Sequence, residues 1–146
     1  MLFLGDFVGT WQAPVIDAII EFPKIARTSA NTENILFQID TGADSKIIFP
    51  QHLKTYRHSD FRGYPTDESR GLGGKLVVWR IPVHFRFYTT SDDGTTQRLD
   101  EEITVDIPEP DEKLKGLPNL LGRDVLRFFR LTIDQRTGLV SLDDGE

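Results

Sequence analysis

One long run of β-favouring residues constrains the fold of this chain more than any other feature. From Lys75 to Thr90 the sequence is KLVVWRIPVHFRFYTT, in which β-branched and aromatic residues dominate. Pro82 within the run predicts an edge position or a bulge, because proline cannot donate a hydrogen bond to a neighbouring strand. The run therefore predicts a fold dominated by β-strands.

Shorter β-favouring segments separated by turn-forming residues extend this pattern. Val15–Phe22 and Ile35–Ile39 flank the polar segment Arg27–Asn34, so we expect a hairpin there. Apolar residues at helical spacing predict one short helix at Gly122–Phe129. Further expectations are a short apolar segment at Ser45–Phe49, a helical turn within Gln51–Arg57, loops at His58–Arg70 and Pro108–Gly116, a turn at Ser91–Thr95 before a strand at Gln97–Ile107, and a last hairpin of Leu131–Ile133 and Leu139–Leu142. The sequence thus predicts one all-β domain, residues 1–146, with one short helix near the C-terminus.

Composition excludes several classes of function. The formal net charge of −6 argues against nucleic acid as a partner, because phosphate binding needs a basic face. The chain has no cysteine, which excludes disulfides, thiol catalysis and cysteine-bound zinc. The three histidines lack metal-ligand spacing, so we expect neither a metal nor an organic cofactor.

Hydropathy gives an expectation about the compartment. No segment approaches the ~20 apolar residues of a membrane span. Met1–Trp11 lacks the basic start and unbroken apolar stretch of a signal peptide. We therefore expect a soluble, cytoplasmic protein that does not bind membranes.

The segment FQIDTGADSKIIFP, residues Phe37–Pro50, places a carboxylate between two apolar stretches. A tight turn between two strands would explain Asp40, Thr41 and Gly42, because these residue types favour turns. However, a carboxylate between buried segments is costly unless it is hydrogen-bonded or functional. Gly42 permits a sharp turn and close approach of another chain, and the Thr41 hydroxyl can donate and accept hydrogen bonds.

Two further motifs follow in the chain: GLGG at Gly71–Gly74, and NLLGRD at Asn119–Asp124. Together with the Asp-Thr-Gly-Ala segment, and in this order, they resemble the pattern of the retropepsin-like aspartic peptidases over about Ile35–Leu142. The resemblance implies a closed β-barrel that acts as a homodimer, in which each copy supplies one Asp-Thr-Gly loop. This chain has one such loop, so Asp40 would need the Asp40 of a second copy.

The resemblance also implies roles for individual residues. Asp40, Thr41 and Gly42 would form the catalytic loop, with Thr41 bracing the dimer. The substrate, an extended polypeptide, would contact Ala43, Asp44, Pro118, Leu120 and a flap tip of Gly71, Leu72, Gly73 and Gly74. Leu121, Gly122 and Arg123 would support the loop, with Arg123 paired to Asp44. Gln38 departs from the apolar residue of the retroviral enzymes, His58–Arg70 looks inserted, and two C-terminal strands replace one.

Simpler interpretations stay open for most of these residues. Arg123 and Asp44 would also suit a purely structural ion pair, and Leu120 and Leu121 would suit a core. GLGGK is a poor match to a phosphate-binding loop, because it opens a β-run rather than a helix, and an inert hairpin turn is the stronger alternative. Trp11 and Trp79 are expected to pack against other residues, although Trp79 could instead contact substrate.

Two functions from different classes are consistent with the motifs. The first is a homodimeric aspartic endopeptidase that activates water between two Asp40 carboxylates. The second is a peptide-binding or assembly module that kept the fold without turnover. A hydrolase fragment that needs a partner domain is a third possibility.

Overall fold

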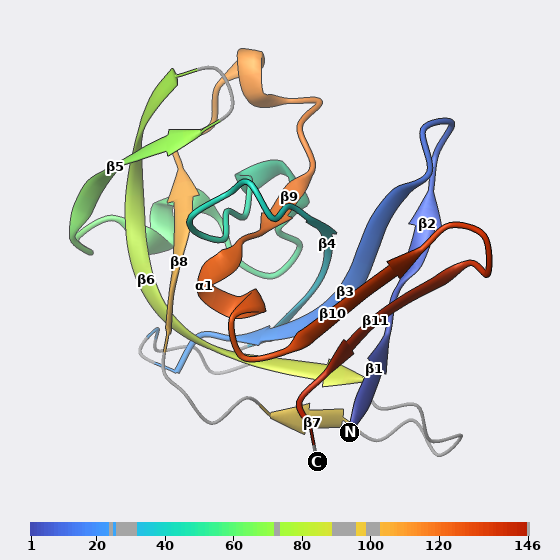
Figure 1. Ribbon diagram of the computed structural model, residues 1–146. Helices are drawn as coiled ribbons and strands as arrows, with labels where there is room; N and C mark the ends of the chain where they lie inside the picture. Colours follow the sequence, from blue (N-terminus) through green and yellow to red (C-terminus); the bar gives the residue numbers. More distant parts are fainter. Residues whose placement is uncertain (24, 26–31, 72–73, 89–95, 99–102, 146) are drawn as a thin grey trace.

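The computed structural model describes residues 1–23, 25, 32–71, 74–88, 96–98 and 103–145, and it is mostly β with little helix (Figure 1). The strands are β1 (Leu2–Leu4), β2 (Asp6–Val8), β3 (Ala13–Glu21), β4 (Thr32–Ile39), β5 (Thr66–Gly71), β6 (Gly74–Tyr88), β7 (Thr96–Arg98), β8 (Ile103–Pro108), β9 (Asn119–Leu121), β10 (Arg130–Asp134) and β11 (Leu139–Asp143). The helices are the 3₁₀ turns Pro50–His52, His58–Phe61 and Glu112–Leu114, and the α-helix α1 (Arg123–Leu126). No helix in the described ranges is both long enough and apolar enough to cross a bilayer.

Strand β6 pairs with more strands than any other described strand of the larger sheet. It pairs antiparallel with β5 over Gly74–Trp79, with β8 over Val78–Val83, and with β3 from His84 onward. Pro82 lies in the gap between the stretches that β5 and β3 pair, so one edge of β6 has no described strand partner there. The expectation that Pro82 marks an edge position is therefore confirmed, because its missing N–H removes no ladder hydrogen bond.

The remaining strands of the larger sheet include β4, which ends directly before Asp40. Strand β3 forms an antiparallel hairpin with β4, and β4 pairs in parallel with β9. A separate sheet has the order β1–β11–β10 and lies across the end of the molecule where the termini meet (Figure 1). The Phe3 ring of this sheet lies 5.6 Å from the Phe87 ring of β6 and 5.9 Å from that of Phe129. These contacts join the two sheets in one core.

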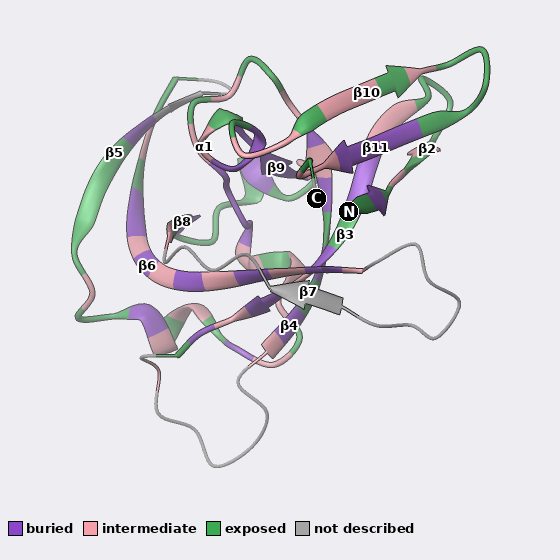
Figure 2. Cartoon of the chain, turned by 60° about the horizontal axis from the view of Figure 1, so that its bottom comes forward, coloured by how far each residue is buried: buried purple, intermediate pink, exposed green. Residues whose placement is uncertain are grey.

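Burial follows the strand period of two along β6. From Trp79 to Tyr88 buried and half-buried side chains alternate, and the buried ones belong to the main core (Figure 2). A smaller apolar cluster of Ile47, Phe49 and Leu114 packs with Leu76 of β6. This cluster connects the segment after Asp40 to the β5–β6 hairpin.

The predicted strands are confirmed at β3, β6, β10 and β11, but several boundaries differ. Strand β4 begins at Thr32, within the segment predicted as a loop up to Asn34. The Glu33 side chain is buried there and accepts backbone hydrogen bonds from Lys54 and Tyr56, which removes the cost of burying its charge. Residues 27–31 of that loop and the turn Ser91–Thr95 lie outside the described residues.

Other predicted elements are wrong in part. The segment His58–Arg70, predicted as a loop, contains a 3₁₀ turn and most of β5. Thr66–Glu68 is exposed and polar, so β5 lacks the apolar alternation of a half-buried strand and gains its order by pairing with β6. The predicted helix Gly122–Phe129 is only the four-residue α1. Strands β1 and β2 lie in Met1–Trp11, for which the sequence predicted no element.

Candidate active site

Asp40 directly follows β4, and backbone hydrogen bonds hold its loop in place. Its N–H donates to the Leu121 carbonyl at 3.0 Å, one step beyond the parallel pairing of Ile39 with Leu121. The Asp40 Oδ1 atom accepts from the Gly42 N–H at 2.9 Å, and the Asp40 carbonyl accepts from Ala43. Asp40 is half-buried, whereas Thr41 and Gly42 are exposed. The carboxylate is therefore fixed at its base and open on one side.

Strand β9 lies between β4, which leads into the Asp40 loop, and Ile47, which follows the loop. β4 pairs with one edge of β9, while Ile47 exchanges backbone hydrogen bonds with Leu120 at 2.9 and 3.0 Å. Gly122, which follows β9, lies inside the loop. A Cβ atom built on Gly122 would be 2.6 Å from the Ser45 carbonyl oxygen and 2.9 Å from that of Ala43. Only glycine therefore allows the backbones to approach this closely.

Arg123 contacts the loop through both its backbone and its side chain. Its N–H donates to the Ala43 carbonyl at 2.9 Å, and its guanidinium Nη2 donates to Asp44 Oδ1. The predicted ion pair between Arg123 and Asp44 is thus formed. Both side chains are largely exposed, 59% for Arg123 and 80% for Asp44, so the pair contributes little to stability by itself.

Lys46 forms a second, buried connection beneath the loop. Its side chain is 2% exposed, and its Nζ donates to Asp124 Oδ2 on α1. Burial lowers the pKa of Lys46, although the negative charge of Asp124 acts in the opposite direction. The cost of removing the ammonium from water therefore exceeds the attraction within the pair. The other Asp124 oxygen, Oδ1, is buried and accepts no hydrogen bond from the described residues.

A chain of polar contacts runs from the loop to the β5–β6 hairpin. The Ser45 Oγ donates to Asp106 Oδ2 at 2.9 Å, and Arg80 Nε lies 3.3 Å from Asp106 Oδ1. Arg80 also pairs with Asp67 of β5 at 2.9 Å. Burial raises the pKa of Asp106, while the Ser45 hydroxyl and Arg80 partly oppose the rise. This chain connects the segment after Asp40 with the base of the hairpin.

The remaining residues predicted for the site are distributed as follows. Leu120 and Leu121 are buried, as expected of a core, and Pro118 is half-buried. Gly71 pairs with Gly74 at the end of the β5–β6 hairpin, which fits a hairpin tip. Leu72 and Gly73 lie outside the described residues, so the predicted apex stays a prediction.

The tryptophans differ from each other. Trp79 is buried and lies 6.5 Å from the Phe61 ring, as expected for a packing residue. Trp11 is 92% exposed on the turn between β2 and β3, so the expectation that it packs is wrong. The turn ends the β2–β3 pairing at Val8 and Ala13, which leaves Trp11 beyond the last paired residues.

The polar residues around the loop were not singled out from the sequence. Lys46 directly precedes the apolar stretch Ile47–Phe49. A lysine that is buried together with such a stretch needs a buried partner for its charge. That signal was available for Lys46. Nothing in the linear sequence identified Asp106 or Asp124 as the partners, because both lie far along the chain.

Chemically, the loop presents one anchored, half-buried carboxylate, that of Asp40. The Asp40 carboxylate can accept a proton from a bound water, but a second group must protonate the reacting oxygen. Among the described residues, no three histidine, aspartate or glutamate side chains gather in the manner of a metal site.

Comparison with known proteins gives a likeness of fold. Among solved structures, the chain is similar to the EIAV protease complexed with the inhibitor HBY-793, with 20% sequence identity and a TM-score of 0.48. The alignment covers 82% of this chain and 90% of that one. No protein-family model matches the sequence, and no curated protein sequence matches it. The likeness concerns the fold and says nothing about the chemistry of the site.

Proposed function

We propose that this protein is a homodimeric aspartic endopeptidase with a retropepsin-like barrel, which hydrolyses peptide bonds between the Asp40 carboxylates of two copies. One observation carries the proposal. Asp40 is fixed by backbone bonds at its base, while Thr41 and Gly42 beside it are exposed. An anchored carboxylate on an open loop is suited to meet a second copy of itself.

Two such carboxylates perform chemistry that one cannot. At a separation of a few ångströms they share one proton and titrate as a pair, because both cannot ionise easily. The ionised member accepts a proton from water, and the protonated member donates to the scissile carbonyl. The Gly42 N–H that donates to Asp40 Oδ1 orients the carboxylate within each copy.

The other residues complete the proposed site. Thr41 braces the two loops across the dimer axis, and its exposed position leaves it available for that contact. The polypeptide substrate lies extended along Gly42, Ala43 and Asp44, with Pro118 and Leu120 bordering a side-chain subsite. The hairpin tip Gly71–Gly74 acts as the flap. Leu121, Gly122 and Arg123 hold the loop through the bonds described above.

Cleavage of a peptide library between about pH 3 and 7, with product analysis by mass spectrometry, tests the proposal. We expect cleavage by the wild type, none by Asp40→Asn, and wild-type cleavage by Asp17→Asn, a matched change at an exposed acid of β3. Sedimentation of the same samples is expected to show a dimer. Cleavage that persists in Asp40→Asn would remove Asp40 from the mechanism, and peptide binding without turnover would favour the non-catalytic module.

A further inference from the structure

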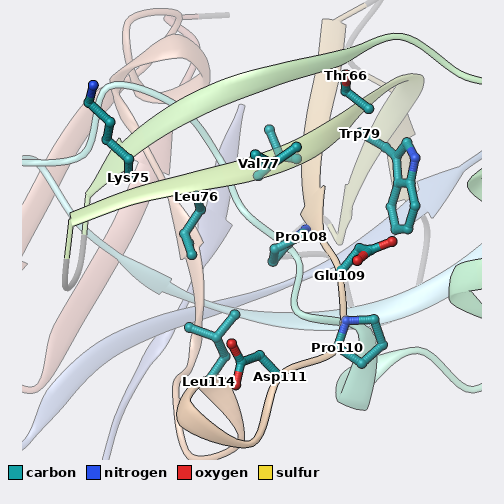
Figure 3. Close-up of a pocket in the computed structure, with 11 residues that line it drawn as sticks. Thr66, Lys75, Leu76, Val77, Trp79, Pro108, Glu109, Pro110, Asp111 and Leu114 are labelled. Carbon is teal, nitrogen blue, oxygen red and sulfur yellow. The ribbon is translucent and has the colours of Figure 1, made fainter.

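A cavity lies between the β5–β6 hairpin and the segment that follows β8 (Figure 3). Its volume is about 300 Å³. Leu76 and Leu114 face each other at one end, and Trp79 lies near Glu109 at the other. No residue of Asp40–Asp44 lines it, so it is a separate site from the one proposed above.

One wall of this cavity is an unpaired strand edge. Strand β8 ends at Pro108, opposite Val78, so Gly74–Val77 of β6 have a described partner only on the β5 side. The Arg80 N–H donates toward β5, to the Pro65 carbonyl. Because backbone groups of successive strand residues point to alternate edges, those of Lys75 and Val77 point to the unpaired edge. Two N–H and C=O pairs are therefore available beside the cavity.

The walls and rim of the cavity define the side chains that it would accept. Leu76, Leu114, Pro108 and Pro110 provide apolar surface. Glu109 is exposed at the cavity and has no hydrogen-bond or ion-pair partner among the described residues. Asp111 adds a second carboxylate, whose Oδ1 accepts from the Lys113 N–H. Lys75 also lines the cavity, but it lies on the hairpin side, with its Nζ 3.9 Å from Glu68. The side of the rim that holds Glu109 and Asp111 is therefore complementary to a basic group.

We propose that this cavity binds an extended peptide that adds as a strand to the unpaired edge of β6, with an apolar side chain between Leu76 and Leu114 and a basic side chain at Glu109. Strand addition of this kind obtains affinity from main-chain hydrogen bonds and specificity from alternate side chains. The unpaired edge spans only Gly74–Val77, so a segment of about four to six residues fills it. This site does not depend on the proposed peptidase activity.

The bound peptide is expected to affect the segment that follows the Asp40 loop. Leu76 and Leu114 line the cavity and also pack with Ile47 and Phe49, in the segment that leads away from Asp40. A peptide seated against Leu76 and Leu114 therefore contacts the same cluster from the other side. The same peptide is thus expected to shift the amide resonances of Ile47 and Phe49 more weakly than those of Lys75 and Val77.

Binding of a labelled hexapeptide of alternating leucine and arginine tests this proposal. The full chain carrying Asp40→Asn is used, so that proposed cleavage cannot consume the probe. Fluorescence anisotropy is expected to show binding of this peptide, and no binding when glutamate replaces arginine. Amide exchange of Lys75 and Val77, followed by NMR, is expected to slow in the complex.

Variants separate the contributions of charge and strand edge. Glu109→Gln is expected to weaken binding about two- to fivefold, whereas Glu112→Gln, three residues away and outside the cavity, has no effect. Val77→Pro removes an N–H of the edge and is expected to weaken binding about two- to tenfold. A peptide methylated at alternate backbone nitrogens tests the same bonds if Val77→Pro does not fold.

The proposal is overturned by any of three results. The first is equal binding, or equal absence of binding, of the arginine and glutamate peptides. The second is full binding of the methylated peptide. The third is protection confined to residues 40–44, which would place the peptide in the proposed catalytic cleft. The first two leave the peptidase proposal untouched, because that proposal is tested by cleavage and by Asp40→Asn.

Discussion

The buried ion pair of Lys46 and Asp124 gives a prediction whose size follows from the structure. Lys46→Met removes the ammonium and keeps most of the side-chain volume. Among the described residues, Asp124 then keeps only the hydrogen bond from the Lys46 backbone N–H, at 3.4 Å, and its Oδ1 has no partner there even in the wild type. Breaking a buried pair costs about 3–5 kcal/mol. Because the Asp124 side chain is 25% exposed, we expect the lower end, a loss of about 3 kcal/mol in the free energy of unfolding.

The double variant Lys46→Met/Asp124→Leu is the matched comparison. The lowered pKa of Lys46 indicates that desolvation outweighs attraction within the pair. Replacing both charges by apolar side chains is therefore expected to restore stability to within about 1 kcal/mol of the wild type. Urea unfolding with a constant m-value measures all four members of the cycle. A loss below about 1 kcal/mol in Lys46→Met, or strict additivity in the double variant, would refute this reasoning.

Three further predictions concern the neighbouring residues. Gly122→Ala is expected to lower the free energy of unfolding by about 1–3 kcal/mol, because a Cβ there meets the Ser45 and Ala43 carbonyls; a thermal melt equal to the wild type contradicts this. Arg123→Gln is expected to cost less than about 1 kcal/mol in urea unfolding, since its pair with Asp44 is exposed, and a larger loss shows that the pair is structural. Because burial raises the pKa of Asp106, the folded state holds its proton to higher pH than the unfolded state, and this stabilisation is lost as pH rises through the folded pKa. The wild type is therefore expected to gain stability relative to Asp106→Asn as pH falls from neutral through that pKa, and a pH-independent difference between them contradicts the assignment.

The sequence was informative where a local pattern decides the structure. The β-favouring run Lys75–Thr90 predicted β6, which begins one residue earlier, at Gly74. Pro82 correctly indicated a stretch of β6 where one edge has no described strand partner. The resemblance of the motifs to the retropepsin-like pattern implied that Gly122 and Arg123 support the Asp40 loop, and the structure brings the Arg123 N–H to the Ala43 carbonyl. Glycine at position 122 has a direct cause in the distance to Ser45.

The sequence was less informative where tertiary pairing decides the structure. Strand β5 is polar and exposed over Thr66–Glu68, so only its register with β6 makes it a strand. Asp106, the partner of Ser45, and Asp124, the partner of Lys46, lie about sixty to eighty residues further along the chain. The residues next to these two aspartates in the sequence do not indicate the contacts. The cavity beside β6 depends on where β8 ends, which a β-favouring pattern fixes only to within a few residues.

Subunit mixing tests the proposed shared site most directly. Wild-type protein and Asp40→Asn are refolded together in equal amounts, and peptide cleavage is compared with wild type at the same total concentration. If each site needs Asp40 from two copies and the chains pair at random, about one quarter of the wild-type activity remains. Retention of about one half, with random pairing verified by mass-labelled chains, would mean that each chain works alone and would contradict the proposal.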